Sequence, residues 1–197
     1  EDGILDGFQQ RNVNANPDTD NARAVIRNLE LRNFGAGASA QNMPDALVDG
    51  LYSRGIGPNA TPDPGQNLLT GGARHSVYHK IHQLGGGAGA AEHFIYLDPG
   101  DGVQGMRLVG ASSWASGQCF IKLRGWDEFV VSDCHGGGIG LGNAPGTNED
   151  VLRLEYCRNG VVSNLSMRKT VARGGYDGLH INNSWNIRYS NIELDEC

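Results

Sequence analysis

The feature that most constrains the fold is a short phrase that recurs along the whole chain. Two clear copies read VSNL at 162–165 and YSNI at 189–192: an apolar residue, any residue, then Asn, Asp or Gly, then an apolar residue. Eight copies begin at residues 5, 26, 48, 78, 103, 131, 162 and 189, in steps of 21 to 31 residues. Repeats of this period are typical of solenoids, propellers and other arrays.

The third place of the phrase predicts a sharp bend between two short strands. Asn, Asp and Gly tolerate the left-handed backbone region better than other residues do. The copy at 78 is poorer because Lys80 stands in this place. We expect equivalent bends with positive φ at Gly7, Asn28, Gly50, Gly105, Asp133, Asn164 and Asn191.

The residues around each bend alternate between apolar and polar with the period of a strand. In the last copy, Ile187 and Tyr189 are expected to point inward around Arg188. A further short strand precedes the later copies, at 121–123, 152–154 and 179–181. Propeller blades need tight hairpins and repeats of roughly 40 residues or more. The pattern therefore predicts an all-β fold, a right-handed parallel β-helix of about eight coils with three short strands per coil.

One domain is expected to cover residues 1–197. The coil pattern begins close to residue 1 and continues to the last residues, and no capping helix is predicted at either end. Solenoids need polar caps for solubility. We therefore expect a part of a longer chain, or subunits stacked end to end.

Bulk properties narrow the classes of partner. The net charge of −6 and the lack of a basic block argue against nucleic acid. No apolar run is long enough to span a membrane, so no membrane association is expected.

The metal-ligating residue types are not arranged as a site. Cys119, Cys134, Cys157 and Cys197 match no zinc spacing and share no column, so no disulfide is predicted, and Cys134 is expected to fill core. The histidines of HSVYHKIH, 75–82, do not share one face of a strand. We expect no metal site and no cofactor.

Stacking of the coils places equivalent residues in columns, and one column has the character of a binding face. The column expected on the first strand contains Tyr96, Lys122, Arg153 and His180. Aligned cations repel one another unless an anionic group lies beside them. Aromatic residues are expected in the turn after this strand, and they suit the apolar faces of sugar rings. These are Trp126, Tyr156 and Trp185. The alternative is a solvated polar face with no ligand.

Two further columns are expected on the outside. One is largely apolar and indicates a surface covered by another subunit or by a terminal segment. It contains Ile4, Val25, Leu47, Val77, Gly102, Val130, Val161 and Arg188. The other is polar and of mixed charge, as expected for a solvated face. It contains Gln9, Glu30, Tyr52, His82, Arg107, His135, Ser166 and Glu193.

The segment YDGLHINNSWNIRYSNIELDEC, 176–197, resembles the pectate-lyase and polygalacturonase superfamily of β-helices, which includes bacteriophage tailspikes and depolymerases. The resemblance implies that Asp177 is a catalytic carboxylate and that Lys122 and Arg153 act on uronic acids. If the protein is an enzyme, His180 and Asp177 are candidates for the acid or the orienting group. The family's paired Asp residues one coil later, and its calcium-binding Asp cluster, have no counterpart in this sequence.

Two functions follow from different classes of protein. The first is an extracellular, secreted or virion-associated β-helix that binds an acidic polysaccharide, either without cleaving it or with cleavage as a lyase or hydrolase. The second is a structural shaft, tail-fibre or filament subunit with no catalytic activity. Both predict a homo-oligomer, either a lateral trimer or an end-to-end stack.

Overall fold

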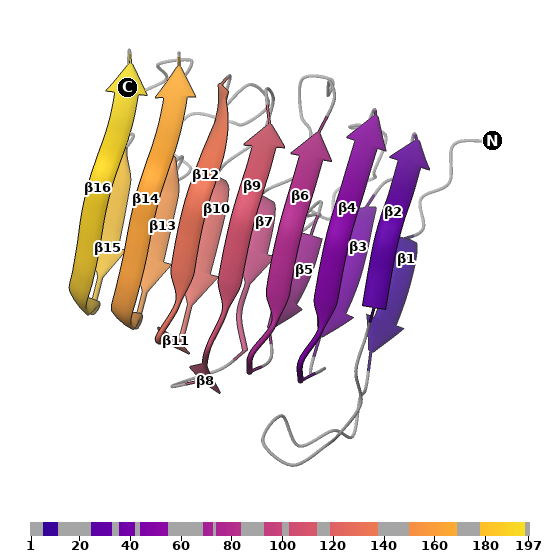
Figure 1. Ribbon diagram of the computed structural model, residues 1–197, viewed down its shortest axis with the longest axis horizontal. Helices are drawn as coiled ribbons and strands as arrows, with labels where there is room; N and C mark the ends of the chain where they lie inside the picture. Colours follow the sequence, from indigo (N-terminus) through magenta and orange to yellow (C-terminus); the bar gives the residue numbers. More distant parts are fainter. Residues whose placement is uncertain are drawn as a thin grey trace, which may run out of the picture.

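The protein is a right-handed parallel β-helix, seen here in a computed structural model (Figure 1). The structure describes residues 6–11, 25–32, 36–41, 44–54, 69–72, 74–83, 93–99, 103–113, 119–137, 150–168 and 178–195. In Figure 1 the front strands run upward and the back strands run downward while the chain advances from right to left, which is a right-handed coil. No helix able to cross a membrane occurs in these ranges.

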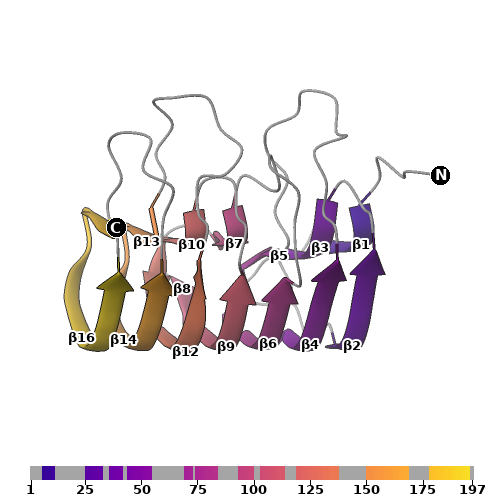
Figure 2. The same ribbon diagram turned by 90° about the horizontal axis from the view of Figure 1, so that it is seen from above.

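Two parallel sheets form the walls of the solenoid, and Figure 2 shows them as facing layers. Sheet 1 has seven strands: β1 (Asp6–Arg11), β3 (Ala36–Gln41), β5 (Leu69–Gly72), β7 (His93–Leu97), β10 (Cys119–Arg124), β13 (Leu152–Glu155) and β15 (Leu179–Asn182). Sheet 2 contains β2 (Val25–Arg32), β4 (Leu47–Arg54), β6 (Val77–Gln83), β9 (Arg107–Ser113), β12 (Val130–Gly137), β14 (Arg158–Arg168) and β16 (Trp185–Asp195). Two short strands extend sheet 2: β8 (Val103–Gln104) pairs with β11 (Trp126–Asp127), and β11 pairs with the beginning of β14.

Left-handed residues make the bends of the coil, as predicted. One column of them runs through the middle of sheet 2, and every member has a φ between 50° and 80°: Asn28, Gly50, Lys80, Gly110, Asp133, Asn164 and Asn191. A second column lies just before the sheet 2 strands or, in β14 and β16, at their second residue, with φ between 52° and 78°: Asp45, His75, Gly105, Glu128, Asn159 and Asn186. The predicted bends outside β1 therefore have the expected conformation.

Two members of the predicted repeat were assigned to the wrong place. Gly7 lies in β1, which pairs with β3 in sheet 1, so Gly7 is not an additional bend of sheet 2 and eight coils is too many. Gly105 belongs to the second column of bends, and Gly110 takes its place in the first. The segment 108–111 fits the phrase as well as 103–106 does. It forms the bend of the first column because Leu108 fills the core between Tyr78 and Val131.

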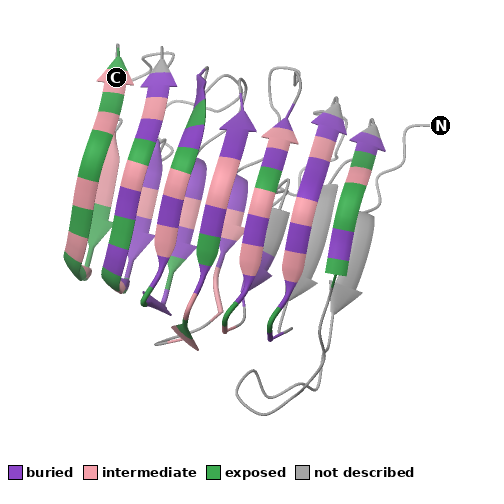
Figure 3. Cartoon of the chain, viewed as in Figure 1, coloured by how far each residue is buried: buried purple, intermediate pink, exposed green. Residues whose placement is uncertain are grey.

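The core lies between the sheets and is built from the inward residues of successive coils. Figure 3 shows bands of buried residues that continue from strand to strand across sheet 2. One such band contains Ile26, Val48, Tyr78, Leu108, Val131 and Val162. Cys134 is buried opposite Leu165, as predicted for a core residue. In the last coil, Ile187 and Tyr189 pack against this core on either side of the exposed Arg188, also as predicted.

Side-chain amides reinforce the first column of bends. Asn191 Nδ2 donates to Asn164 Oδ1 at 2.9 Å, and Asn164 Nδ2 donates to Asp133 Oδ1 at 2.8 Å. These exposed bonds connect three successive coils at the residues whose backbone is left-handed. The same residues thus adopt the left-handed conformation that the bend requires and form hydrogen bonds between neighbouring coils.

We expect Asn164→Val to lower the free energy of unfolding by about 3–4 kcal/mol. The left-handed conformation costs a β-branched residue roughly 1–2 kcal/mol, and the two ladder bonds contribute about 1 kcal/mol each. Asn164→Gly is the matched control, because glycine loses the bonds without the backbone strain. Denaturant unfolding measures both, and equal losses in the two variants would show that the bend does not require a left-handed residue.

Candidate functional site

The predicted column on the outer face of sheet 1 is present in the structure. Tyr96 pairs with Lys122, Lys122 with Arg153, and Arg153 with His180, each as Cα partners on adjacent strands. All four side chains are partly exposed. Inward Ile and Leu residues on the same strands fix this orientation by strand alternation. The four residues, together with the charged groups around them, are called the sheet 1 ladder below.

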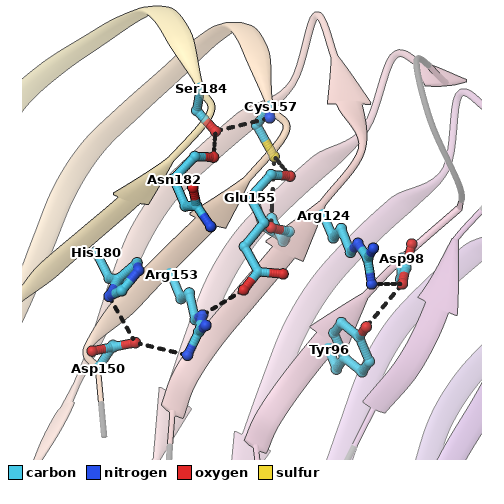
Figure 4. Close-up of polar contacts among 11 residues, drawn as sticks. Tyr96, Asp98, Arg124, Asp150, Arg153, Glu155, Cys157, His180, Asn182 and Ser184 are labelled. Atoms are coloured by element: carbon cyan, nitrogen blue, oxygen red, sulfur yellow. Dashed lines mark hydrogen bonds and ion pairs between the residues drawn. The ribbon is translucent and has the colours of Figure 1, made fainter. Parts of the chain in front are cut away.

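Carboxylates within the protein neutralise Arg153. Its Nε lies 2.7 Å from Glu155 Oε1, and its Nη1 lies 3.6 Å from Asp150 Oδ2 (Figure 4). The side chains of Arg153, Glu155 and Asp150 are only 16%, 11% and 2% exposed. Because charge interactions strengthen away from water, this is a tight internal cluster. The anion that the aligned cations were expected to need is thus supplied here by the chain itself.

His180 is held by the same buried carboxylate. Its Nδ1 lies 3.7 Å from Asp150 Oδ2, and its side chain is 28% exposed (Figure 4). A carboxylate beside one ring nitrogen orients an imidazole. This arrangement can orient His180 for proton transfer.

A second cluster connects Tyr96 to the corner of the coil. The Tyr96 hydroxyl donates to Asp98 Oδ2 at 2.8 Å, and Arg124 Nη1 lies 3.9 Å from the same oxygen (Figure 4). Lys122 Nζ lies 4.9 Å from the centre of the Tyr96 ring, and the guanidinium of Arg124 lies 5.6 Å from the ring of Tyr156. Both are cation–π distances, so each cation rests against an aromatic face. Burial, and then the Asp98 carboxylate, raises the pKa of Tyr96 to about 12.

Two of the three aromatic residues that were expected in the turn after the first strand are exposed. Tyr156 and Trp185 are 46% and 57% exposed. Trp126 is wrong as a binding residue, because it is completely buried and its Nε1 donates to the Leu97 carbonyl at 3.0 Å. Asp127, one residue later, is the residue that precedes Arg158 and Trp185 in the outward column. A shift of one residue along a strand reverses the face on which a side chain lies.

Several residues of the face were not singled out from the sequence. Asp98, Arg124 and Glu155 each follow a ladder residue by two positions, so strand alternation places them on the same face. That spacing is a signal that sequence reasoning could have used. Asp150 precedes β13 and gives no such signal, because its approach to Arg153 and His180 depends on the path of the chain. Asp177 lies outside the described residues.

The cysteines and the other metal-ligating residue types can be placed for the described ranges. Within the described ranges, no group of three or more His, Cys, Asp or Glu side chains is placed to hold a metal ion. Cys119, Cys134 and Cys157 are buried free thiols. Burial raises the pKa of Cys119 and of Cys134 to about 12 and that of Cys157 to about 11. These groups are therefore thiols at neutral pH and not nucleophiles.

On sheet 2 the predicted outer columns are present with two replacements. Val25, Leu47, Val77, Val130 and Val161 form one column on the outer face, with Arg107 in the place expected for Gly102. Ser112 replaces Arg107 in the polar column, and Gln9 lies in sheet 1. Both replacements follow from the shift of register at Gly110. Ile4 and Gly102 lie outside the described residues.

Comparison with known proteins gives no relative: no protein-family model, no curated protein and no solved structure matches this chain.

The two tryptophans should respond differently to truncation. We expect Trp126→Ala to lower the free energy of unfolding by about 3–5 kcal/mol, because it removes a buried aromatic side chain. Trp185→Ala should change it by less than about 1 kcal/mol, because the ring is largely exposed. Denaturant unfolding of both variants tests this, and similar losses would contradict the assigned faces.

The pKa of Tyr96 predicts an alkaline titration. A difference in phenolate absorbance between the wild type and Tyr96→Phe should show one phenol ionising near pH 12. The folded-state pKa of Tyr96 is above the ordinary value of about 10. The contribution of the neutral Tyr96 hydroxyl to the free energy of unfolding is therefore complete below pH 10 and is lost as pH rises through 12. Asp98→Asn should lower this pKa, because a negative charge beside the phenol is removed. A pKa near 10 in the folded wild type would contradict the Tyr96–Asp98 contact.

Proposed function

We propose that the sheet 1 ladder binds a linear acidic polysaccharide that lies along the solenoid axis. The observation that carries the proposal is the in-register column of Tyr96, Lys122, Arg153 and His180 on one partly exposed face. Adjacent strands are about 4.8 Å apart. A polymer of similar repeat can therefore present one unit to each coil, which a compact ligand cannot do.

The chemistry of this face suits sugars. Carboxylates, guanidinium groups and an imidazole offer hydrogen-bond partners for hydroxyl groups. The exposed rings of Tyr156 and Trp185 offer apolar surfaces for the faces of sugar rings. Arg158 lies 5.9 Å from the Trp185 ring and keeps a cation beside that surface. A polysaccharide ligand implies a place outside the cell or on a virion, and this location is part of the proposal.

Catalytic roles can be distributed over the same residues. Lys122 is the cation best placed to offset a substrate carboxylate, because Arg153 is already enclosed by Asp150 and Glu155. His180 is the candidate for proton transfer, and Asp150 orients it. Arg153 then acts as a positioning residue that holds the two carboxylates. Cleavage by β-elimination would be detected as an unsaturated product that absorbs in the ultraviolet.

A structural role is the second candidate, and a different surface favours it. Val25 and Val161 are 49% and 37% exposed in a column that also contains Leu47, Val77 and Val130, with Arg107 between Val77 and Val130. Isolated exposed apolar residues are ordinary, but apolar residues aligned on adjacent strands mark an interaction surface. In this role the outer face of sheet 2 packs against other copies of the chain. A lateral homo-oligomer is compatible with a ligand on sheet 1.

Removal of the ladder charge should weaken glycan binding. We expect Lys122→Gln to lower the affinity for an acidic oligosaccharide about 10-fold or more, as for loss of one charge-assisted contact. Arg107→Gln on sheet 2 is the control, since it removes one cation far from the ladder. Calorimetric titration measures both, and equal affinities in Lys122→Gln and wild type would remove the support for this site.

The apolar column predicts self-association. Light scattering of the wild type should give a mass above one subunit at micromolar concentration. Val130→Glu with Val161→Glu should shift it to the monomer mass, because buried like charges oppose docking. A sharp monomer mass for the wild type would refute the lateral oligomer.

A further inference from the structure

The charges on the outer face of sheet 1 are not spread evenly from coil to coil. Strand β10 carries two cations, Lys122 and Arg124, and no acidic residue. The preceding coil contributes Asp98 after β7. The following coil contributes Arg153 together with Glu155 and Asp150, which is one cation against two carboxylates. The face therefore has a positive coil between two coils of net negative charge.

Aromatic rings hold the two cations of β10 in place. Lys122 Nζ lies over Tyr96 at 4.9 Å, and the Arg124 guanidinium lies over Tyr156 at 5.6 Å. Arg124 is only loosely paired with Asp98, at 3.9 Å, and its side chain is 45% exposed. Positively charged groups that are restrained but not neutralised form a prepared site for an anion.

We propose that this face recognises a sparsely charged glycan, with one acidic sugar among neutral ones, seated so that its acidic group contacts Lys122 and Arg124. The proposal rests on the glycan-binding function proposed above and specifies the ligand for it. The acidic sugar occupies the β10 coil, and neutral sugars face the coils on either side. Hydroxyl groups of those neutral sugars donate to Asp98 on one side and to Glu155 on the other.

A homopolymer of uronic acid fits this pattern poorly. With one carboxylate per sugar and one sugar per coil, its neighbouring carboxylates would lie opposite Asp98 and opposite the Glu155–Asp150 pair. Coils are about 4.8 Å apart, which is shorter than the Debye length of about 8 Å at physiological salt. Screening therefore does not remove the repulsion between these carboxylates.

Three oligosaccharides of equal length test the proposal by calorimetric titration. One is a homo-oligomer of galacturonate, the second carries a single internal uronate among neutral hexoses, and the third is the carboxyl-reduced form of the second. We expect the single-uronate ligand to bind most tightly, roughly 10-fold tighter than the homo-oligomer for one carboxylate repulsion of this range. Lys122→Gln should reduce the affinity for the single-uronate ligand to that for the neutral ligand.

Glu155→Gln is the decisive variant, because it removes a negative charge and keeps a hydrogen-bond acceptor for Arg153. It should raise the affinity for the homo-oligomer and narrow the difference between the two acidic ligands. Asp98→Asn should do the same, whereas Arg107→Gln should leave the order of the three ligands unchanged. Circular dichroism confirms that each variant is folded.

The outcomes distinguish a failure of sparse-charge recognition from a failure of glycan binding itself. If the wild type binds the homo-oligomer as tightly as the single-uronate ligand, or if Glu155→Gln does not change their ratio, sparse-charge recognition is wrong while glycan binding stands. If the neutral and single-uronate ligands bind equally, the β10 cations are not the anion site. Absence of binding by all three refutes the proposed function itself.

Discussion

Left-handed residues at the bends are the constraint on which the rest of this fold depends. Coils that stack in register must repeat the same backbone conformation at every corner. A corner with positive φ admits Gly, Asn and Asp at low cost, and other residues at a cost of about 1–2 kcal/mol. The first column of bends obeys this rule at every place except Lys80. There, strand pairing on both sides of the bend outweighs the local preference.

Stacking in register has a consequence for charge, because it brings similar side chains together in columns. Neighbouring cations at the strand spacing repel unless other groups intervene. On sheet 1 the chain supplies those groups from adjacent positions: Asp150 and Glu155 around Arg153, and the Tyr96 ring beneath Lys122. Glu155 is the second residue after Arg153 along the strand, Asp150 lies just before that strand, and Tyr96 is the partner of Lys122 on the neighbouring strand. The polar face is therefore a consequence of the same register that builds the core.

The repeat made most of the fold predictable, since its period and its left-handed places are both local properties of the sequence. The prediction from the repeat failed where two segments of the sequence complete the phrase equally well. Gly105 and Gly110 each complete the phrase, and only packing of Leu108 in the core decides between them. Trp126 was misassigned because a one-residue difference reverses its face. Asp150 was not predictable, because its contacts join a segment before β13 to side chains of two coils.

In a regular solenoid, the positions that break a column carry more information than those that continue it. Arg107 interrupts the apolar column of sheet 2 and divides it into a part with Val25, Leu47 and Val77 and a part with Val130 and Val161. A partner on that face must accommodate a cation at the middle, which restricts the registers in which two copies can pack. On the opposite face, β10 carries two cations and no carboxylate, whereas in the next coil two carboxylates surround the single cation Arg153. Because the core separates the two outer faces (Figure 2), binding on one leaves the other open for assembly.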